Sequence, residues 1–211
     1  MVITISIAGI SGKMGGLIAD ALLLKYPEAM IHGMCRSPSK VHQRISSHPN
    51  VTLFQAESTD SAACRAAVAG TSVCICCYLD LFDSTLMVEG QKRLIDACIA
   101  EGVPRYIASD WCMDFRGLLL GDHPAKDPMK LVHAYLDEKE MVGMIKQVHI
   151  LVGGFMEFFF AGFLGYVDTD KGEFTHYGEG DEKLDMITMR NAAEFTAEVA
   201  VDSNAIGFLN C

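Results

Sequence analysis

The chain has 211 residues, of which 50% are hydrophobic and 21% are charged, a composition typical of globular proteins and not of disordered or fibrous ones. The formal net charge of -10 disfavours nucleic acid as a partner, because an acidic surface repels phosphate backbones and no basic patch is visible. The apolar start, residues 2–8, lacks the basic segment and the length of a secretory signal, so we expect a cytoplasmic protein.

Apolar runs of strand length alternate with segments of helical periodicity along the chain. We expect strands at 2–8, 30–35, 51–54, 73–78, 106–109 and 148–152, and short ones near 174–177 and 184–188. Helices are expected at 14–26, 60–69, 84–101, 127–145 and 191–201, with Gly102 ending the third and Asp127 capping the fourth.

This order predicts a Rossmann-like, doubly wound α/β fold, because parallel strands that are buried on both faces are apolar throughout. We predict a single domain over residues 1–211, with a dinucleotide-binding core at 1–152 and a partial substrate lobe at 153–211.

Two apolar segments have alternative interpretations. Residues 150–167 approach the length of a membrane-spanning helix, but Glu157 and several glycines interrupt them, so we expect a buried strand and a pocket wall, with no membrane contact. Cys74 and Cys77 have C-x-x-C spacing, but no second pair follows at the spacing of zinc ligands. We therefore predict buried thiols and no metal site.

The first strand leads into three glycines spaced three apart, Gly9, Gly12 and Gly15, and a helix follows. Such a turn lets a pyrophosphate approach the backbone and the helix N-terminus, whereas the alternative is a tight turn with no ligand. We predict that NADP(H) is held by the turn, by the end of the second strand and by the end of the fourth: Gly9, Ser11, Gly12, Lys13, Met14, Gly15, Arg36, Lys40 and Tyr78.

The end of the second strand favours NADP over NAD. NAD sites usually place an acidic residue there, which accepts hydrogen bonds from the adenosine ribose. Here the strand is followed by Arg36, and a guanidinium can hold a 2′-phosphate with two hydrogen bonds, with Lys40 as a second charge. The alternative is that both are solvated surface charges.

Taken in order, several segments resemble the NmrA-like and isoflavone-reductase-like branch of the short-chain dehydrogenase/reductase superfamily. The resemblance covers nearly the whole chain. It is carried by the glycine turn, by Arg36 and by the segments YIASDW at 106–111, GGFME at 153–157, YGEGD at 177–181 and NAAEFT at 191–196. In the last of these, Asn191 stands where the family usually has Asp.

The resemblance implies NADPH binding and, in many members, reduction of phenolic or other small natural products. Other members bind the dinucleotide without turnover and act as regulators. The family chain is usually longer, so we expect a substrate lobe with incompletely covered apolar residues. Such a patch usually marks a binding surface, which predicts a homodimer or a large apolar ligand. The candidate residues of the patch are Phe155, Phe158, Phe159 and Phe163.

Reduction of a carbonyl group needs an acid for the developing alkoxide and a nearby cation that lowers the pKa of that acid. Tyr135 and Lys139 are four residues apart, on one face of a helix, and Ser109 ends a strand at the ligand-binding edge of the sheet. We predict catalytic roles for all three. The alternative is that Tyr135 is a core aromatic residue and Lys139 a solvated charge. The resemblance implies Lys130 as a rival, because isoflavone-reductase-like enzymes use a lysine in this helix.

We expect an NADPH-dependent reductase of a small aromatic or polyketide-like molecule, since the apolar stretch 155–163 is suited to a pocket wall. The alternative is a non-catalytic NADP(H) sensor, because one fold hosts enzymes and sensors. His123, in a loop, and His149, within a strand, are expected to be structural.

Overall fold

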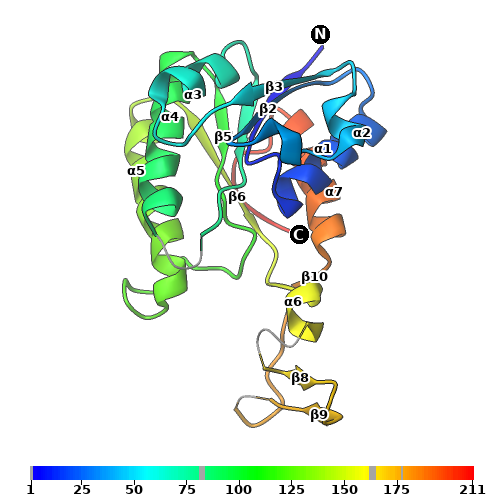
Figure 1. Cartoon of the computed structure of the whole chain (residues 1–211). Coiled ribbons are helices and arrows are strands. Elements are labelled where there is room, and N and C mark those ends of the chain that lie inside the picture. Colours follow the sequence, from blue (N-terminus) through cyan, green and yellow to red (C-terminus); the bar gives the residue numbers. More distant parts are fainter. Residues whose placement is uncertain (1, 81–83, 162–164, 177) are drawn as a thin grey trace.

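The computed structural model describes residues 2–80, 84–161, 165–176 and 178–211, and its centre is a seven-stranded sheet with helices on both faces (Figure 1). The strand order is β11-β6-β5-β4-β1-β2-β3, and neighbouring strands pair in parallel. The strands are β1 (Thr4–Ala8), β2 (Met30–Cys35), β3 (Val51–Gln55), β4 (Val73–Cys76), β5 (Arg105–Ile107), β6 (Lys146–Leu151) and β11 (Gly207–Asn210). The predicted Rossmann-like, doubly wound fold is confirmed.

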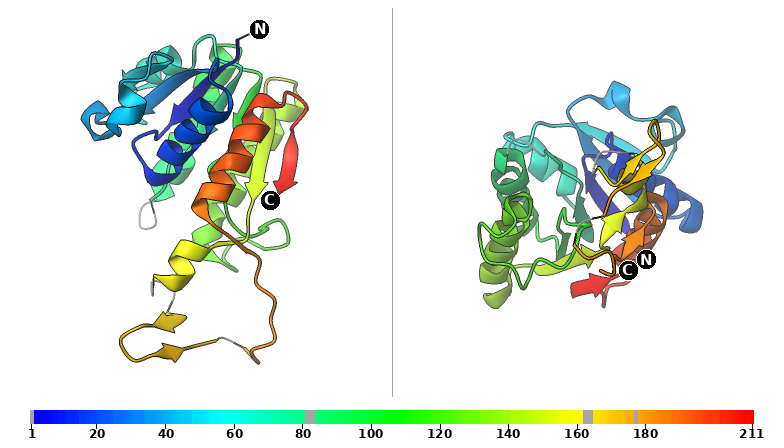
Figure 2. Two further views of the ribbon diagram at one scale, coloured as in Figure 1. Left: turned by 90° about the vertical axis from the view of Figure 1, so that its right-hand side faces the viewer. Right: turned by 90° about the horizontal axis from the view of Figure 1, so that it is seen from below.

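Helices bury both faces of this sheet. Helices α1 and α7 pack side by side on one face (Figure 2), where the short helix α2 also contributes to the core. Helices α3, α4 and α5 cover the other face. Their bounds are α1 (Lys13–Lys25), α2 (Gln43–Ser46), α3 (Ser61–Val68), α4 (Gln91–Ala100), α5 (Asp127–Met141) and α7 (Met189–Val201), and a π-helical turn (Leu86–Gly90) leads into α4.

Both cysteines of strand β4, Cys74 and Cys76, are core residues. Val73 and Ile75 point into the core beneath α1 and α7, whereas Cys74 and Cys76 point into the core beneath α3 and α4. Burial raises the pKa of both thiols, which therefore stay protonated. No group of three or more His, Cys, Asp and Glu side chains within the described ranges is arranged to hold a metal ion.

Two predicted helix ends have different outcomes. Gly102 follows α4 with φ +70, as expected for a glycine that ends a helix. Asp127 does not cap α5, so that prediction is wrong. A 3-10 turn, Pro124–Lys126, precedes Asp127, whose carboxylate accepts a hydrogen bond from the N–H of Gly121 at 3.1 Å. The turn places Asp127 inside the helix and not before it.

The sheet is completed by β11, which the sequence did not lead us to expect. β11 pairs with β6, and the buried guanidinium of Arg105 on β5 fastens the segment between α7 and β11. Arg105 donates hydrogen bonds of 2.6–3.3 Å to the carbonyls of four residues: Val199, Ala200, Asp202 and Ala205. One buried cation therefore ties the end of α7 to the middle of the sheet.

A smaller lobe lies beyond the carboxyl edge of the sheet (Figure 1). It contains β7 (Gly154–Phe155), which pairs with β10 (Met186–Ile187), the helix α6 (Met156–Phe160), and the antiparallel pair β8 (Val167–Asp168) and β9 (Glu173–Phe174). Gly153 has φ +69, and a Cβ there would lie 2.2 Å from the backbone oxygen of Asp185, so the two connections to the core pass too closely for a larger residue. Among the described residues, no helix is both long enough and apolar enough for a membrane crossing.

Candidate functional site

The turn between β1 and α1 accepts only glycine at two positions. Gly9 has φ +88, and its N–H donates to the carbonyl of Met34 at 2.8 Å. A Cβ at Gly15 would lie 2.4 Å from the oxygen of Gly9, so α1 packs against the turn more closely than any larger residue permits. Gly12 precedes α1, and no side chain caps the helix. The first N–H groups of α1 are therefore available to an anion.

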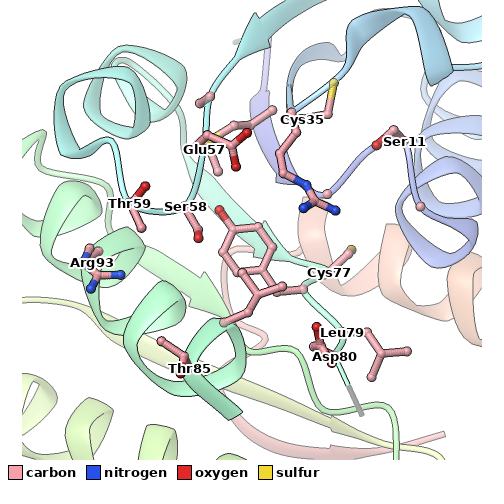
Figure 3. Close-up of a pocket in the computed structure, with 17 residues that line it drawn as sticks. Ser11, Cys35, Glu57, Ser58, Thr59, Cys77, Leu79, Asp80, Thr85 and Arg93 are labelled. Atoms are coloured by element: carbon pink, nitrogen blue, oxygen red, sulfur yellow. The ribbon is translucent and has the colours of Figure 1, made fainter. Parts of the chain in front are cut away.

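A cavity of about 410 Å³ lies beside this turn, at the carboxyl edge of the sheet (Figure 3). Strand order reverses between β1 and β4, and such a reversal is where open α/β sheets bind ligands. The cavity is lined by the glycine turn, the ends of β2, β3 and β4, and the segment that begins α4: Gly9, Ser11, Gly12, Met34, Cys35, Arg36, Ala56, Glu57, Ser58, Thr59, Cys77, Tyr78, Leu79, Asp80, Thr85, Leu86 and Arg93.

A second, smaller cavity of about 280 Å³ adjoins the first and is lined by polar and charged residues. Its lining residues are Ser11, Arg36, Ser37, Lys40 and Glu57. The ion pairs within the described ranges do not include Arg36 or Lys40, so both cations can pair with a ligand. Two cations and two hydroxyl groups around one small space are suited to a phosphate.

The predicted dinucleotide residues divide into two groups. Those that line a cavity come from the turn and the strand ends: Gly9, Ser11, Gly12, Arg36, Lys40 and Tyr78. Lys13, Met14 and Gly15 line neither cavity and form the first turn of α1. The sequence reasoning missed the loop after β3, at 56–59, and Arg93 on α4. The order of strands carries a signal for that loop, since carboxyl ends of neighbouring parallel strands share one edge.

Tyr78 carries a polar atom that has no partner among the described residues. The residue is 8% exposed, lines the larger cavity, and its hydroxyl makes no hydrogen bond to this part of the chain. Burial raises the pKa of Tyr78, so the hydroxyl stays protonated and can donate. A buried hydroxyl without a partner costs free energy, and a ligand in the cavity can remove that cost.

Ser109 lies behind the wall of the larger cavity and forms hydrogen bonds to it. Its hydroxyl donates to the backbone oxygen of Tyr78 at 2.7 Å, and its N–H donates to Gln91 Oε1 at 3.1 Å. The side chain is buried and lines neither cavity. Ser109 thus joins the end of β5 to the end of β4, and its predicted catalytic role stays a prediction.

Tyr135 and Lys139 do lie together on α5, but beside α4 and outside both cavities. The hydroxyl of Tyr135 donates to Asp96 Oδ1 at 2.6 Å, and Lys139 Nζ lies 4.5 Å from the centre of the Tyr135 ring. Burial and the Asp96 carboxylate raise the pKa of Tyr135, which opposes its use as an acid. The ammonium of Lys130 donates to the backbone oxygens of Phe115 and Leu118.

A buried pair of His149 and Asp110 lies under α5. His149 Nδ1 is 2.6 Å from Asp110 Oδ2, and both side chains are almost completely buried. Gln147 donates from Nε2 to Asp137 at 2.5 Å, so its Oε1 faces His149 Nε2, at 2.8 Å, and accepts from it. His149 links β6 to the turn after β5, which fits the structural role expected of it.

The apolar patch predicted for the smaller lobe is partly present. Phe155 is half-buried, Phe159 is buried, and Phe158 is 39% exposed. Phe163 lies outside the described residues. Two further aromatic residues of this lobe, Phe160 and Phe174, are 59% and 63% exposed.

The family model of the NmrA-like family matches residues 1–208. The chain belongs to this family. The match includes the smaller lobe and reaches into β11. Among curated proteins, none matches the chain.

Solved structures share this fold at low sequence identity. The structure "AtPrR2 with NADP+ and (+)pinoresinol" has a TM-score of 0.78 and 16% identity, and the match covers 100% of this chain and 70% of the AtPrR2 chain. Isoflavone reductase has a TM-score of 0.77 and 17% identity, covering 100% and 69%. The NADPH-dependent quinone oxidoreductase QOR2 from Escherichia coli, complexed with NADPH, has a TM-score of 0.75 and 21% identity, covering 97% and 67%.

Proposed function

We propose that this protein is an NADPH-dependent reductase of a small aromatic or polyketide-like molecule. The observation that carries the proposal is the junction of two cavities at the glycine turn, one large and one lined by two cations that form no ion pair with any described residue. A dinucleotide with a 2′-phosphate needs a large space beside a helix N-terminus and an adjoining polar space for the 2′-phosphate.

The residues present fit such a cofactor. The first N–H groups of α1 would face the pyrophosphate of a bound dinucleotide, because Gly15 brings the helix against the turn. Arg36 and Lys40 would hold the 2′-phosphate, and the hydroxyl of Tyr78 would donate to the adenosine part. Bound NADPH supplies a hydride, and the protein must supply a proton.

The substrate class rests on the smaller lobe and on the relatives. Exposed aromatic side chains at α6 and β9 provide an apolar surface on the carboxyl side of the sheet, which suits an aromatic molecule. AtPrR2 was solved with pinoresinol, and the other two relatives are named for isoflavone and quinone reduction. These names support, for this chain, a substrate that is aromatic and carries a reducible group.

A test combines binding with turnover. Titration of NADPH by its fluorescence measures binding, and loss of NADPH absorbance with a panel of aryl ketones, enones and quinones measures reduction. We expect binding in the absence of substrate and turnover with at least one class. A protein that binds neither NADPH nor NADH contradicts the proposal.

The second candidate is a sensor that binds NADP(H) without turnover. It is favoured by the positions of Tyr135, Lys139 and Lys130, which line neither cavity. Tight binding without oxidation of NADPH across the whole panel supports the sensor and contradicts the reductase.

A further inference from the structure

A carboxylate of the smaller lobe lies at the start of a core helix. Glu157 is in the first turn of α6, and its two carboxylate oxygens accept from the N–H of Met189, at 2.8 Å and 3.1 Å. Met189 is the first residue of α7. The first N–H groups of a helix have no partner within the helix, and the helix dipole favours a negative charge there. Glu157 therefore satisfies a donor that α7 cannot satisfy by itself.

Two paired strands bring these residues together. β7 leads directly into α6, and β10 leads through Thr188 into α7, so the pairing of the two strands places the two helix starts side by side. Figure 1 shows α6 below α7, beside β10. Thr188 is the N-cap of α7, and its hydroxyl accepts from the N–H of Asn191 at 3.1 Å. The N–H of Met189 is thus left to Glu157.

Apolar contacts hold the lobe together but do not fix how α6 lies against the core. Phe159 stacks on Tyr166 with ring centroids 4.7 Å apart, and both residues belong to the lobe. At the connections to the core, Phe155 and Ile187 are only partly buried against it. The other four residues of α6 are Met and Phe, whose side chains are apolar. The directional contact between α6 and α7 is therefore the bond from Met189 to Glu157.

This bond orients the surface that the proposed function assigns to the substrate. Phe158 and Phe160 follow Glu157 on α6 and are exposed. A rotation of α6 would move both rings relative to the carboxyl edge of the sheet. The two cavities would stay in place, because no residue of α6 lines them. Loss of the bond should therefore affect the substrate and not the dinucleotide.

We propose that Glu157 is a positioning residue, whose bond to the start of α7 holds the aromatic side chains of α6 in place for the substrate. The proposal rests on the proposed function, since it needs a substrate at the smaller lobe. It assigns to the acid of the segment 153–157 a task outside the dinucleotide site.

The first measurement tests the bond itself. Hydrogen exchange of the Met189 amide, followed by NMR without NADPH, is compared between the wild type and Glu157→Ala. We expect exchange to be about 3- to 30-fold faster in the variant, the scale of one partly exposed hydrogen bond to a charged group. Exchange of the Asn191 amide should not change, because its acceptor is Thr188. Glu157→Gln retains an acceptor oxygen and should give an intermediate rate.

The second measurement tests the role in turnover. Menadione, a quinone, and chalcone, an aryl enone, are the substrate probes, and loss of NADPH absorbance is the signal. We expect Glu157→Ala to raise KM by about 3- to 10-fold, the scale of one lost aromatic contact, with kcat and the dissociation constant of NADPH changed by less than about 2-fold. Met189→Pro removes the donor in place of the acceptor, at a helix position that tolerates proline, and should raise KM similarly. In the double variant, KM should rise no further.

Three controls separate the bond from other causes. Glu173→Gln removes the same charge from an exposed position on β9 and should leave all of these quantities unchanged. Met189→Ala keeps the N–H and measures the loss of the buried Met189 side chain alone. Trp111 is the only tryptophan of the chain, and its indole donates to Thr196 on α7, so an unchanged melting curve followed by its fluorescence shows that the core is intact.

Four outcomes overturn the proposal. Unchanged exchange of the Met189 amide in Glu157→Ala means that the carboxylate does not hold this N–H. Faster exchange with an unchanged KM means that the bond serves the fold alone. An equal loss of NADPH affinity means that Glu157 acts on the dinucleotide site. A wild type that reduces neither probe removes the role in turnover, and the exchange rates then show whether the bond is absent or only the activity.

Discussion

Arg36 is an exposed cation that lines both cavities and has no ion pair among the described residues. Arg36→Ala is expected to weaken NADPH by about 1–3 kcal/mol, roughly 5- to 150-fold, and to leave NADH almost unaffected, because only NADPH offers a charge-assisted contact there. Fluorescence titration measures both. Arg44→Ala is the matched control, since Arg44 pairs with Asp20 at 3.6 Å and lines neither cavity. Equal wild-type affinity for both dinucleotides contradicts the prediction.

Replacement of Tyr78 tests ligand binding separately from the stability of the fold. Tyr78→Phe removes a buried hydroxyl that has no hydrogen-bond partner in the described part of the chain, so the free energy of unfolding should not fall. NADPH binding should weaken by about 0.5–1.5 kcal/mol, because the hydrogen bond to the adenosine part is lost. Thermal melting and titration of one preparation test both halves. Tyr106→Phe provides the contrast, because the Tyr106 hydroxyl donates to Gln91 within the core, and its removal should lower stability and spare binding. Unchanged affinity in Tyr78→Phe means that the hydroxyl does not face the ligand.

At the level of elements, the position of α1 depends on one glycine more than on its neighbour. Gly15→Ala is expected to lower the free energy of unfolding by about 1–3 kcal/mol and to weaken NADPH, because the new Cβ would lie 2.4 Å from the oxygen of Gly9 and must displace the helix. Gly16→Ala is the control. Its Cβ would lie 3.7 Å from the nearest atom, and the helix should gain about 0.5–1 kcal/mol. Urea denaturation distinguishes them, and equal stability of the two variants contradicts the close packing.

The pair of Asp110 and His149 links β6 to the turn after β5. Asp110→Ala removes the carboxylate partner of the buried His149 Nδ1 and is expected to cost about 3–5 kcal/mol of stability. Asp114→Ala is the matched change in the same loop. Asp114 pairs with Arg116 at the surface, so its loss should change stability little. A melting temperature of Asp110→Ala close to that of Asp114→Ala would show that the pair contributes nothing.

Elements with a local cause could be predicted, and those that depend on distant contacts could not. The glycine turn follows from steric demands within seven residues, and the strands follow from apolar runs that two helix layers cover. By contrast, β11 is four residues long and is fixed by β6 and Arg105. In the candidate site, the turn and Arg36 were recognised because they adjoin their strands. Glu57 and Arg93 reach the cavity only through tertiary packing, and the direction of Tyr135 is set by Asp96 on another helix.

For the whole molecule, the exposed aromatic residues of the smaller lobe predict association. We expect the wild type either to sediment as a dimer or to bind a hydrophobic dye as a monomer, because burial of Phe160 and Phe174 removes apolar surface from water. Replacing both by Ser should reduce the observed effect. Leu24→Ser, at an exposed position on α1, should have none. A wild-type monomer that binds no dye, with or without NADPH, contradicts the prediction.

The attachment of β11 also bears on the order in which the molecule forms during synthesis. Strands β1 to β5 and helices α1 to α4 lie within residues 4–107, and domains fold from the N-terminus as they are made. The carbonyl acceptors of Arg105, and the strand that covers β6, arrive only with residues 199–210. A ribosome-bound chain that lacks them presents an open strand edge beside a buried cation without acceptors, and such an edge can pair with another chain. Residues 199–210 therefore supply the acceptors of Arg105 and cover the edge of β6 with β11, which is itself the edge strand of the sheet.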